Sequence, residues 1–450
     1  MVATYREFLI DLYREHLEEA SFLVEQRRHL LTDDELPWVQ LAEFEDRLEA
    51  HLDALVVGGE LALEACRAAA ADGDPGQLFA AVTVFCRLER APLLAHVLKV
   101  VDLTDADRTA ALSEALRYEL PVAWRDHCSR AIEQGDDRLV PILAEAMAYR
   151  RLRIETSLLP RLSTAPRTAL PSLLWCLGRT PAAASVSAVR ELIQSDDPAT
   201  AEAAVRAGLR LRDQPTFHTL TAARGDHHDP IALGLAGGPQ MVRALLEALN
   251  SSEPTPDVLT GLALLGDLSA VRPLADCLSI EALAGSAAEA LRVITGAPLV
   301  EDAIILDEIS EEEMLPHELA VYRETGERPR RADGQAFGTN VGRVSRDPAV
   351  WQDWLNKNAS RFIRGRRYRF GECCSPRVLL DCLQSEVFPK SYRPWVAEEL
   401  LIRYDIDLSF EADMFVIEQR RVLDAARARI EATSGAFESG QWYFGGHLIS

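Results

Sequence analysis

The chain has 450 residues, of which 48% are hydrophobic and 26% charged, a composition that excludes a disordered or fibrous protein. This length exceeds what one compact core accommodates, so we expect about two or three structural units. The formal net charge of −22 disfavours nucleic acid as a partner and favours basic proteins, whose encounter rate it raises. Solubility alone is an equally good explanation of the charge.

The negative charge is concentrated in two segments. Residues 1–60 hold 5 basic and 15 acidic side chains, a net of −10, and residues 301–330 hold 3 against 10, a net of −7. Together they account for 17 of the 22 net charges. These segments are therefore where we expect a basic partner to be attracted.

The sequence indicates a cytoplasmic protein. Its first turns carry Tyr5, Arg6 and Glu7 instead of the apolar stretch of a signal peptide. The sequence contains no unbroken run of 18 apolar residues, so we expect no membrane span and no membrane partner. The eight cysteines fall mostly on apolar helical faces and form no C-x-x-C pair, which is typical of buried free thiols in a reducing compartment.

Residues 1–60 predict an acidic helical hairpin. Apolar side chains recur at helical spacing over residues 4–29, from Tyr5 and Phe8 to Leu23. A second helix is predicted over residues 41–56. Thr32 and Glu35 have the spacing of a capping box, so we expect Thr32 to begin a helix before Trp38.

Residues 61–296 contain an internal repeat. Equivalent positions at Val189, Phe217, Val242 and Val271 lie 28, 25 and 29 residues apart, and the breaks between them are short. A period of this size with an apolar stripe on both helices of each unit is typical of an α-solenoid. We therefore predict an all-α fold with roughly seven HEAT-like helical pairs.

The last third of the chain predicts two further segments. Residues 297–347 are acidic and rich in glycine and proline, which indicates a connector, with a possible short strand at 303–306. Residues 348–450 predict a helical cap that closes the open end of the solenoid. Its helices are expected at 348–359, 375–385, 391–404 and 411–432.

The cap contains a cluster of arginines and aromatic residues. The arginines are Arg361, Arg364, Arg366, Arg367 and Arg369, and the aromatic residues are Phe362, Tyr368 and Phe370. Such interleaving binds phosphates and stacks bases in nucleic-acid-binding proteins. In a chain this acidic we favour the alternative, in which the aromatic rings face the core. The arginines would then pair with the acidic run of Asp307, Glu308, Glu311, Glu312 and Glu313.

The sequence assigns no catalytic, metal or cofactor site. The run from Asp226 to Asp229 offers four potential metal ligands, but adjacent residues cannot all reach one ion. No serine or cysteine stands in a nucleophile motif, and no glycine-rich loop has the pattern of a phosphate-binding loop. Acidic pairs are plentiful, but nothing selects one of them for catalysis.

The repeats around Leu264–Leu274 resemble HEAT-like repeats of the short, bilin-lyase type. The whole chain resembles a bacterial family of HEAT-like proteins encoded beside type VI secretion effector genes. The resemblance rests on the N-terminal hairpin ending in residues 49–55, on the repeat block, and on Trp351, Trp354 and the arginine cluster at 361–371.

This resemblance implies an immunity protein that neutralises a cognate effector toxin, such as a nuclease with a basic cleft. It carries no catalytic residues to transfer. One alternative is an adaptor that loads an effector for secretion. A second is a HEAT-like repeat enzyme of the lyase or glycosylase type, although a glycosylase would need a basic concave face with stacking aromatics. The oligomeric state stays undetermined by the sequence.

Overall fold

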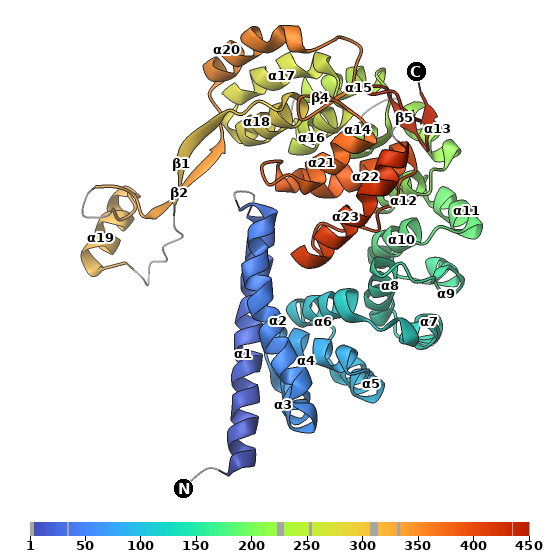
Figure 1. The fold of residues 1–450 in the computed structure, drawn as a ribbon, viewed down its shortest axis with the longest axis vertical. Coiled ribbons are helices and arrows are strands. Elements are labelled where there is room, and N and C mark those ends of the chain that lie inside the picture. Colours follow the sequence, from blue (N-terminus) through green and yellow to red (C-terminus); the bar gives the residue numbers. More distant parts are fainter. Residues whose placement is uncertain are drawn as a thin grey trace.

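The computed structural model of the protein describes residues 4–33, 36–222, 229–251, 254–306, 314–330, 334–433 and 435–449. The chain forms a curved stack of helices with the C-terminal segment inside the curve (Figure 1). The predicted all-α solenoid is confirmed.

The N-terminal unit consists of α1 (Tyr5–Thr32) and α2 (Leu41–Val57), packed side by side as predicted. Thr4 caps α1 in a capping box with Glu7. The capping box predicted at Thr32 is wrong, because Thr32 is the last residue of α1 and its hydroxyl donates to the carbonyl oxygen of His29 at 2.8 Å. The partner in that prediction, Glu35, lies outside the described residues.

The repeats are pairs of inner and outer helices, following α3 (Gly59–Asp72). The inner helices stack on one another in sequence, α4 on α6, α6 on α8 and so on to α18. Their bounds are α4 (Pro75–Arg87), α6 (Ala106–Glu119), α8 (Leu139–Tyr149), α10 (Leu170–Arg179), α12 (Pro198–Arg210), α14 (Pro230–Ala236), α16 (Pro256–Leu265) and α18 (Glu281–Thr295). The outer helices are α5 (Ala91–Val100), α7 (Arg125–Gln134), α9 (Glu155–Leu158), α11 (Ala183–Leu192), α13 (Gln214–Ala222), α15 (Met241–Leu249) and α17 (Val271–Asp276).

The repeat positions found in the sequence all fall on outer helices. Val189 lies in α11, Phe217 in α13, Val242 in α15 and Val271 in α17. Val189 and Phe217 are buried, whereas Val242 and Val271 are half-buried. The pairs run from α4/α5 to α16/α17, in agreement with the predicted number of roughly seven.

The described part of residues 297–347 forms an arm that projects from the end of the stack (Figure 1). Strand β1 (Val300–Leu306) pairs antiparallel with β2 (Gly338–Val344), so that Val300 faces Val344. Between the strands lies α19 (Pro316–Thr325), none of whose residues is buried. The short strand expected at 303–306 is confirmed as part of β1.

The predicted C-terminal helices are confirmed as α20 (Pro348–Asn358), α21 (Pro376–Gln384), α22 (Arg393–Tyr404) and α23 (Val416–Thr433). Helix α20 packs on α17, at the end of the stack where we expected a cap. Helices α21, α22 and α23 instead lie inside the curve, where α22 contacts α12 and α14 and α23 contacts α2 (Figure 1). The segment also holds two short strand pairs, β3 (Tyr368–Arg369) with β4 (Glu372–Cys373) and β5 (Tyr443–Phe444) with β6 (His447–Leu448).

The C-terminal segment shares a hydrophobic core with the last repeats. Leu262 and Leu291 of the repeats belong to the same buried cluster as Trp351, Leu400 and Phe444. A second cluster joins the N-terminal helices to the first repeats. The segment therefore belongs to the solenoid's own core, in addition to covering its end.

Strand β3 approaches the ends of two inner helices closely. The Tyr368 amide donates to the carbonyl oxygen of Gly266, and the Phe370 amide donates to that of Val293. Gly296 has a φ of +65°, and a Cβ added there would lie 2.4 Å from the carbonyl oxygen of Phe370. This position therefore requires glycine both for its backbone conformation and for space.

We expect Gly296→Ala to lower the free energy of unfolding by about 2–4 kcal/mol, because it adds backbone strain and a steric clash. Gly326→Ala is the matched control, since Gly326 has a φ of +74° with no atom within 4 Å of the added Cβ. In the control the free energy of unfolding should fall by only about 1 kcal/mol, because the substitution adds backbone strain without a clash. Urea unfolding of both variants measures the difference, and equal losses would contradict the close approach of β3.

Candidate functional site

The inner face of the curve carries a regular set of arginines at the ends of inner helices. Five inner helices have one in their last turn or just beyond it, and we call this set the arginine ladder. Its members are Arg87, Arg117, Arg151, Arg179 and Arg210. A cation at this place is stabilised by the negative end of the helix dipole and can satisfy the free carbonyls. Arg151, for example, donates to the Ala148 carbonyl oxygen at 3.0 Å.

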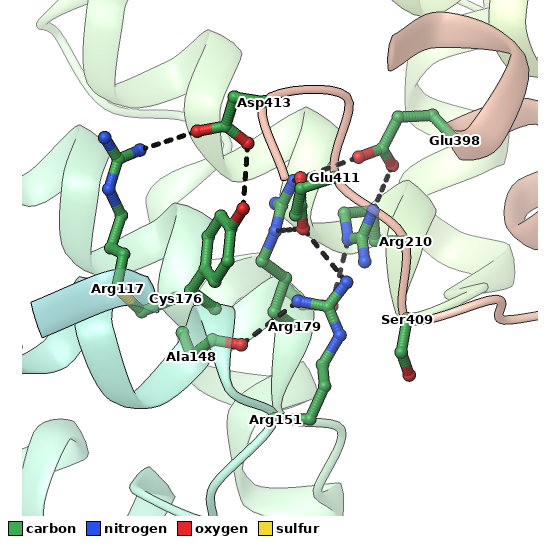
Figure 2. Close-up of polar contacts among 12 residues, drawn as sticks. Arg117, Ala148, Arg151, Cys176, Arg179, Arg210, Glu398, Ser409, Glu411 and Asp413 are labelled. Carbon is green, nitrogen blue, oxygen red and sulfur yellow. Dashed lines mark hydrogen bonds and ion pairs between the residues drawn. The ribbon is translucent and has the colours of Figure 1, made fainter. Parts of the chain in front are cut away.

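Glu411 of the C-terminal segment lies at the centre of the ladder (Figure 2). Its Oε1 accepts hydrogen bonds from Arg179 Nε at 2.7 Å and from Arg151 Nη2 at 2.9 Å. Burial by itself would raise the pKa of Glu411, but the positive charges of Arg179, Arg151 and Arg210 hold that pKa at about 2. Glu411 is therefore ionised at neutral pH and neutralises charge brought by two repeats.

Two further carboxylates extend this arrangement to either side (Figure 2). Glu398 accepts from Arg179 at 3.2 Å and forms an ion pair with Arg210. Asp413 pairs with Arg117 at 3.3 Å and accepts a hydrogen bond from the Tyr149 hydroxyl at 3.1 Å. Burial raises the pKa of Asp413 and outweighs the opposing effect of Arg117.

The ladder also reaches the N-terminal hairpin. Arg27 of α1 donates to the Asp413 carbonyl oxygen at 2.6 Å and to Glu45 at 2.8 Å. The second oxygen of Glu45 accepts the Val416 amide at the start of α23, at 2.6 Å. The C-terminal segment is thus bonded to helix ends from α1 to α12.

At α14 and α16 the C-terminal segment supplies the arginines itself. Arg403 donates to the carbonyl oxygens of Gly234 at 2.8 Å and Gly237 at 3.1 Å, at the end of α14. Arg367 donates to Leu264 and Leu265 at the end of α16, at 2.7 and 3.0 Å. These two inner helices end in Ala236 and Leu265, each followed by a glycine, and not in arginine.

Arg367 and Arg369 of the predicted cluster are therefore buried structural residues. Both pair with Glu399, Arg369 at 2.8 Å, and both side chains are fully buried. Their positive charges hold the pKa of Glu399 below its ordinary value, although burial opposes this. Arg366 pairs instead with Glu438. The acidic run of Asp307, Glu308, Glu311, Glu312 and Glu313, with which these arginines were expected to pair, lies outside the described residues.

Arg361 and Arg364 remain exposed on the outer surface. Arg364 lines an open hollow of about 670 Å³ with Asp267 and Arg272 of the last repeat. Tyr368 is buried, and its hydroxyl oxygen accepts a hydrogen bond from the Ile363 amide at 2.8 Å. With the central arginines and this ring buried, the cluster does not form the exposed stacking surface that nucleic acid requires.

A cavity of about 470 Å³ lies between α10, α12 and α22. Trp175 and Trp395 form its apolar walls, and the guanidinium of Arg179 stacks on the Trp175 ring at 3.6 Å. Glu202 stands at its edge, where burial raises the pKa of that carboxyl. The ladder and its carboxylates neutralise one another around this cavity.

Among the described residues, no group of three or more His, Cys, Asp or Glu side chains is placed to hold a metal ion. Asp229, the last residue of the run considered in the sequence, caps α14 and pairs with Arg206 at 2.5 Å. The other three lie outside the described residues. In the described part of the chain, no helix has both the length and the apolar character needed to cross a bilayer.

The arginine ladder was not predicted, although its regular spacing is visible in the sequence. Its members lie 30, 34, 28 and 31 residues apart, which is close to the repeat period. The apolar repeat positions lie on the outer helices, whereas the arginines recur with a similar spacing at the ends of the inner helices. Tracking a charged residue at the repeat spacing would have located the ends of the inner helices.

Comparison with known proteins yields no family model that matches the chain and no curated protein that is similar to it.

We expect Glu411→Gln to lower the free energy of unfolding by about 3–5 kcal/mol, because it removes the counter-charge of the half-buried Arg151 and leaves the buried Arg179 with Glu398 alone. The control is Glu418→Gln, which removes an exposed pair with Arg421 and should cost under about 1 kcal/mol. Thermal and urea unfolding of both variants check this. A loss at Glu411 no larger than at Glu418 would show that the ladder does not depend on this carboxylate.

The low pKa of Glu411 also predicts an acid dependence. A carboxyl with a depressed pKa stabilises the fold above its ordinary value of 4.5, and this contribution is lost as the pH falls toward about 2. The shift corresponds to about 3 kcal/mol. The difference in unfolding free energy between the wild type and Glu411→Gln should therefore shrink as the pH is lowered from 5 to 2, in urea titrations at each pH. A constant difference over that range would contradict the assignment.

Proposed function

We propose that this protein is a non-enzymatic scaffold that binds and neutralises a basic effector toxin, in the manner of an immunity protein. The observation that carries the proposal is the surface of the N-terminal hairpin. Within the described part of residues 1–60, 11 acidic side chains are exposed against three arginines. Such a surface attracts a basic protein from a distance and repels nucleic acid.

The distribution of charge inside the molecule supports this proposal. On the inner face, the arginine ladder and the carboxylates of residues 398–413 neutralise one another. The negative charge that remains lies on the outside, where it is free to act on a partner. The resemblance to HEAT-like proteins encoded beside type VI effector genes suggests which basic protein that partner is.

The arm offers apolar contacts in addition to this charged surface. Val300 and Ile304 of β1 and Val321 of α19 are exposed, together with Leu315. A two-stranded hairpin is only marginally stable in water, so a partner that covers these side chains would also stabilise the arm. Electrostatic steering and apolar contact are thus available on separate parts of the surface.

Deletion of the gene in its native host tests the proposal. An immunity protein predicts that the deletion strain kills itself, and that deletion of the neighbouring effector gene restores growth. The purified protein should also block the toxin at equimolar concentration, with an association rate that falls as salt is added. A viable deletion strain that fails to secrete the effector would overturn immunity and favour the adaptor.

A further inference from the structure

The outward face of α1 carries one continuous line of exposed side chains. Its members follow one another at alternating steps of three and four residues, which places them along one side of the helix. We call this line the α1 seam, and it consists of Phe8, Asp11, Glu15, Glu18, Phe22, Glu25 and His29. Phe8 is 58% exposed and Phe22 is 54% exposed, which is unusual for phenylalanine.

The seam belongs to a helix that is already packed on its other side. Leu17, Leu23 and Val24 are buried against the first repeats, and α1 contacts α2, α3 and α4. Helix α1 stands at the end of the curve (Figure 1), and at the last turns of the seam Glu25 and His29 line an open hollow with Pro75 of α4 and Asp107 of α6. Helical spacing predicts that Phe8 lies on the apolar face together with Leu23, but the structure exposes Phe8 and buries Leu23.

We propose that the α1 seam binds one basic amphipathic helix of the partner protein. Two apolar side chains of that helix would pack on Phe8 and Phe22, and lysines or arginines between them would face Asp11, Glu15, Glu18 and Glu25. The inference rests on the proposed protein-binding function and names the surface and the chemistry that perform it.

The spacing of the seam sets the geometry of the bound helix. Phe8 and Phe22 are 14 residues apart, a distance of about 21 Å along a helix. Steps of three and four residues correspond to the a and d positions of a coiled coil, which pack against a second helix at a small crossing angle. A partner helix with apolar residues two heptads apart therefore matches both anchors at once.

The charges of the seam distinguish this occupant from a second copy of the chain. Pairing two α1 seams would bring carboxylates against carboxylates, which disfavours self-association. Arg14 forms an ion pair with Asp11 at 3.0 Å, but both side chains are more than 60% exposed, so the pair is weak and open to exchange. A helix rich in lysine or arginine relieves the repulsion among the carboxylates of the seam instead.

A synthetic peptide tests the proposal on the full-length protein. The probe is a helical 21-residue peptide with two leucines 14 positions apart and lysines at the other seam-facing positions, labelled for fluorescence anisotropy. The reference is a peptide of the same composition in scrambled order. We expect the patterned peptide to bind at least about tenfold more tightly than the scrambled one, because only it places leucine on both phenylalanines.

Variants of the seam localise the binding. Phe8→Ala with Phe22→Ala should weaken the patterned peptide by about tenfold or more without changing the melting curve, since both rings are exposed. The triple change Glu15→Gln, Glu18→Gln and Glu25→Gln should weaken it and flatten its salt dependence. A matched control is the triple change Glu191→Gln, Asp276→Asn and Asp424→Asn, which removes the same charge from exposed positions elsewhere.

Three results would overturn the α1 seam as the binding surface. The first is equal binding of the patterned and scrambled peptides, and the second is equal weakening by the seam triple and its control. The third is a wild-type dimer, seen by light scattering, that Phe8→Ala with Phe22→Ala dissociates, because it would assign the seam to a second copy. Seam variants that lose the peptide but still neutralise the toxin would overturn the seam as the toxin site and leave the proposed function standing. If the patterned peptide binds specifically but the deletion strain does not kill itself, the role in toxin neutralisation is overturned and the α1 seam remains a binding surface.

Discussion

The structure depends on the satisfaction of the carbonyl ends of its inner helices. Each inner helix ends in unpaired carbonyl groups and the negative end of a dipole, and stacking the helices brings these ends together. Arg151 and Arg210 donate to such carbonyl oxygens at the ends of α8 and α10, and Arg403 and Arg367 of the C-terminal segment do so at α14 and α16. The ladder arginines of α6 to α12 have Glu398, Glu411 and Asp413 as counter-charges, whereas Arg87 pairs with Glu49 and Glu119 and Arg367 pairs with Glu399.

This arrangement changes how the repeats are coupled. In a simple solenoid each unit contacts only its neighbours, so stability adds up unit by unit. Here the segment from Glu398 to Val416 is bonded to the ends of helices as distant as α2 and α12. Ordering this one segment therefore links repeats that do not touch one another.

The same arrangement separates the two roles of charge in the protein. The buried carboxylates form ion pairs with arginines, and burial and these arginines together set their pKa values. The exposed carboxylates of α1 and α2 have no comparable excess of arginine around them. Burial thus makes one set of acidic residues structural and leaves the other set exposed on the surface.

The sequence by itself determined the elements that local patterns encode. The repeat period, the helices of the C-terminal segment and the end of the repeat block at Gly296 follow from apolar spacing and helix-ending residues, which act within a few turns of the chain. The capping box at Thr32 failed because the apolar pattern of α1 continues through the residue that resembles a cap. The regular recurrence of the arginine ladder was also present in the sequence, although its meaning depended on knowing where the inner helices end.

Only the tertiary structure decided which charges meet and which side chains stay exposed. Arg367 and Arg369 pair with Glu399, some 30 residues further along the chain. Phe8 has the sequence features of a core residue, yet it is exposed on α1 because that helix lies at the N-terminal end of the stack. The physical reason is the same in both cases, because burial and ion pairing are set by what the folded chain brings close, and spacing along the sequence does not specify it.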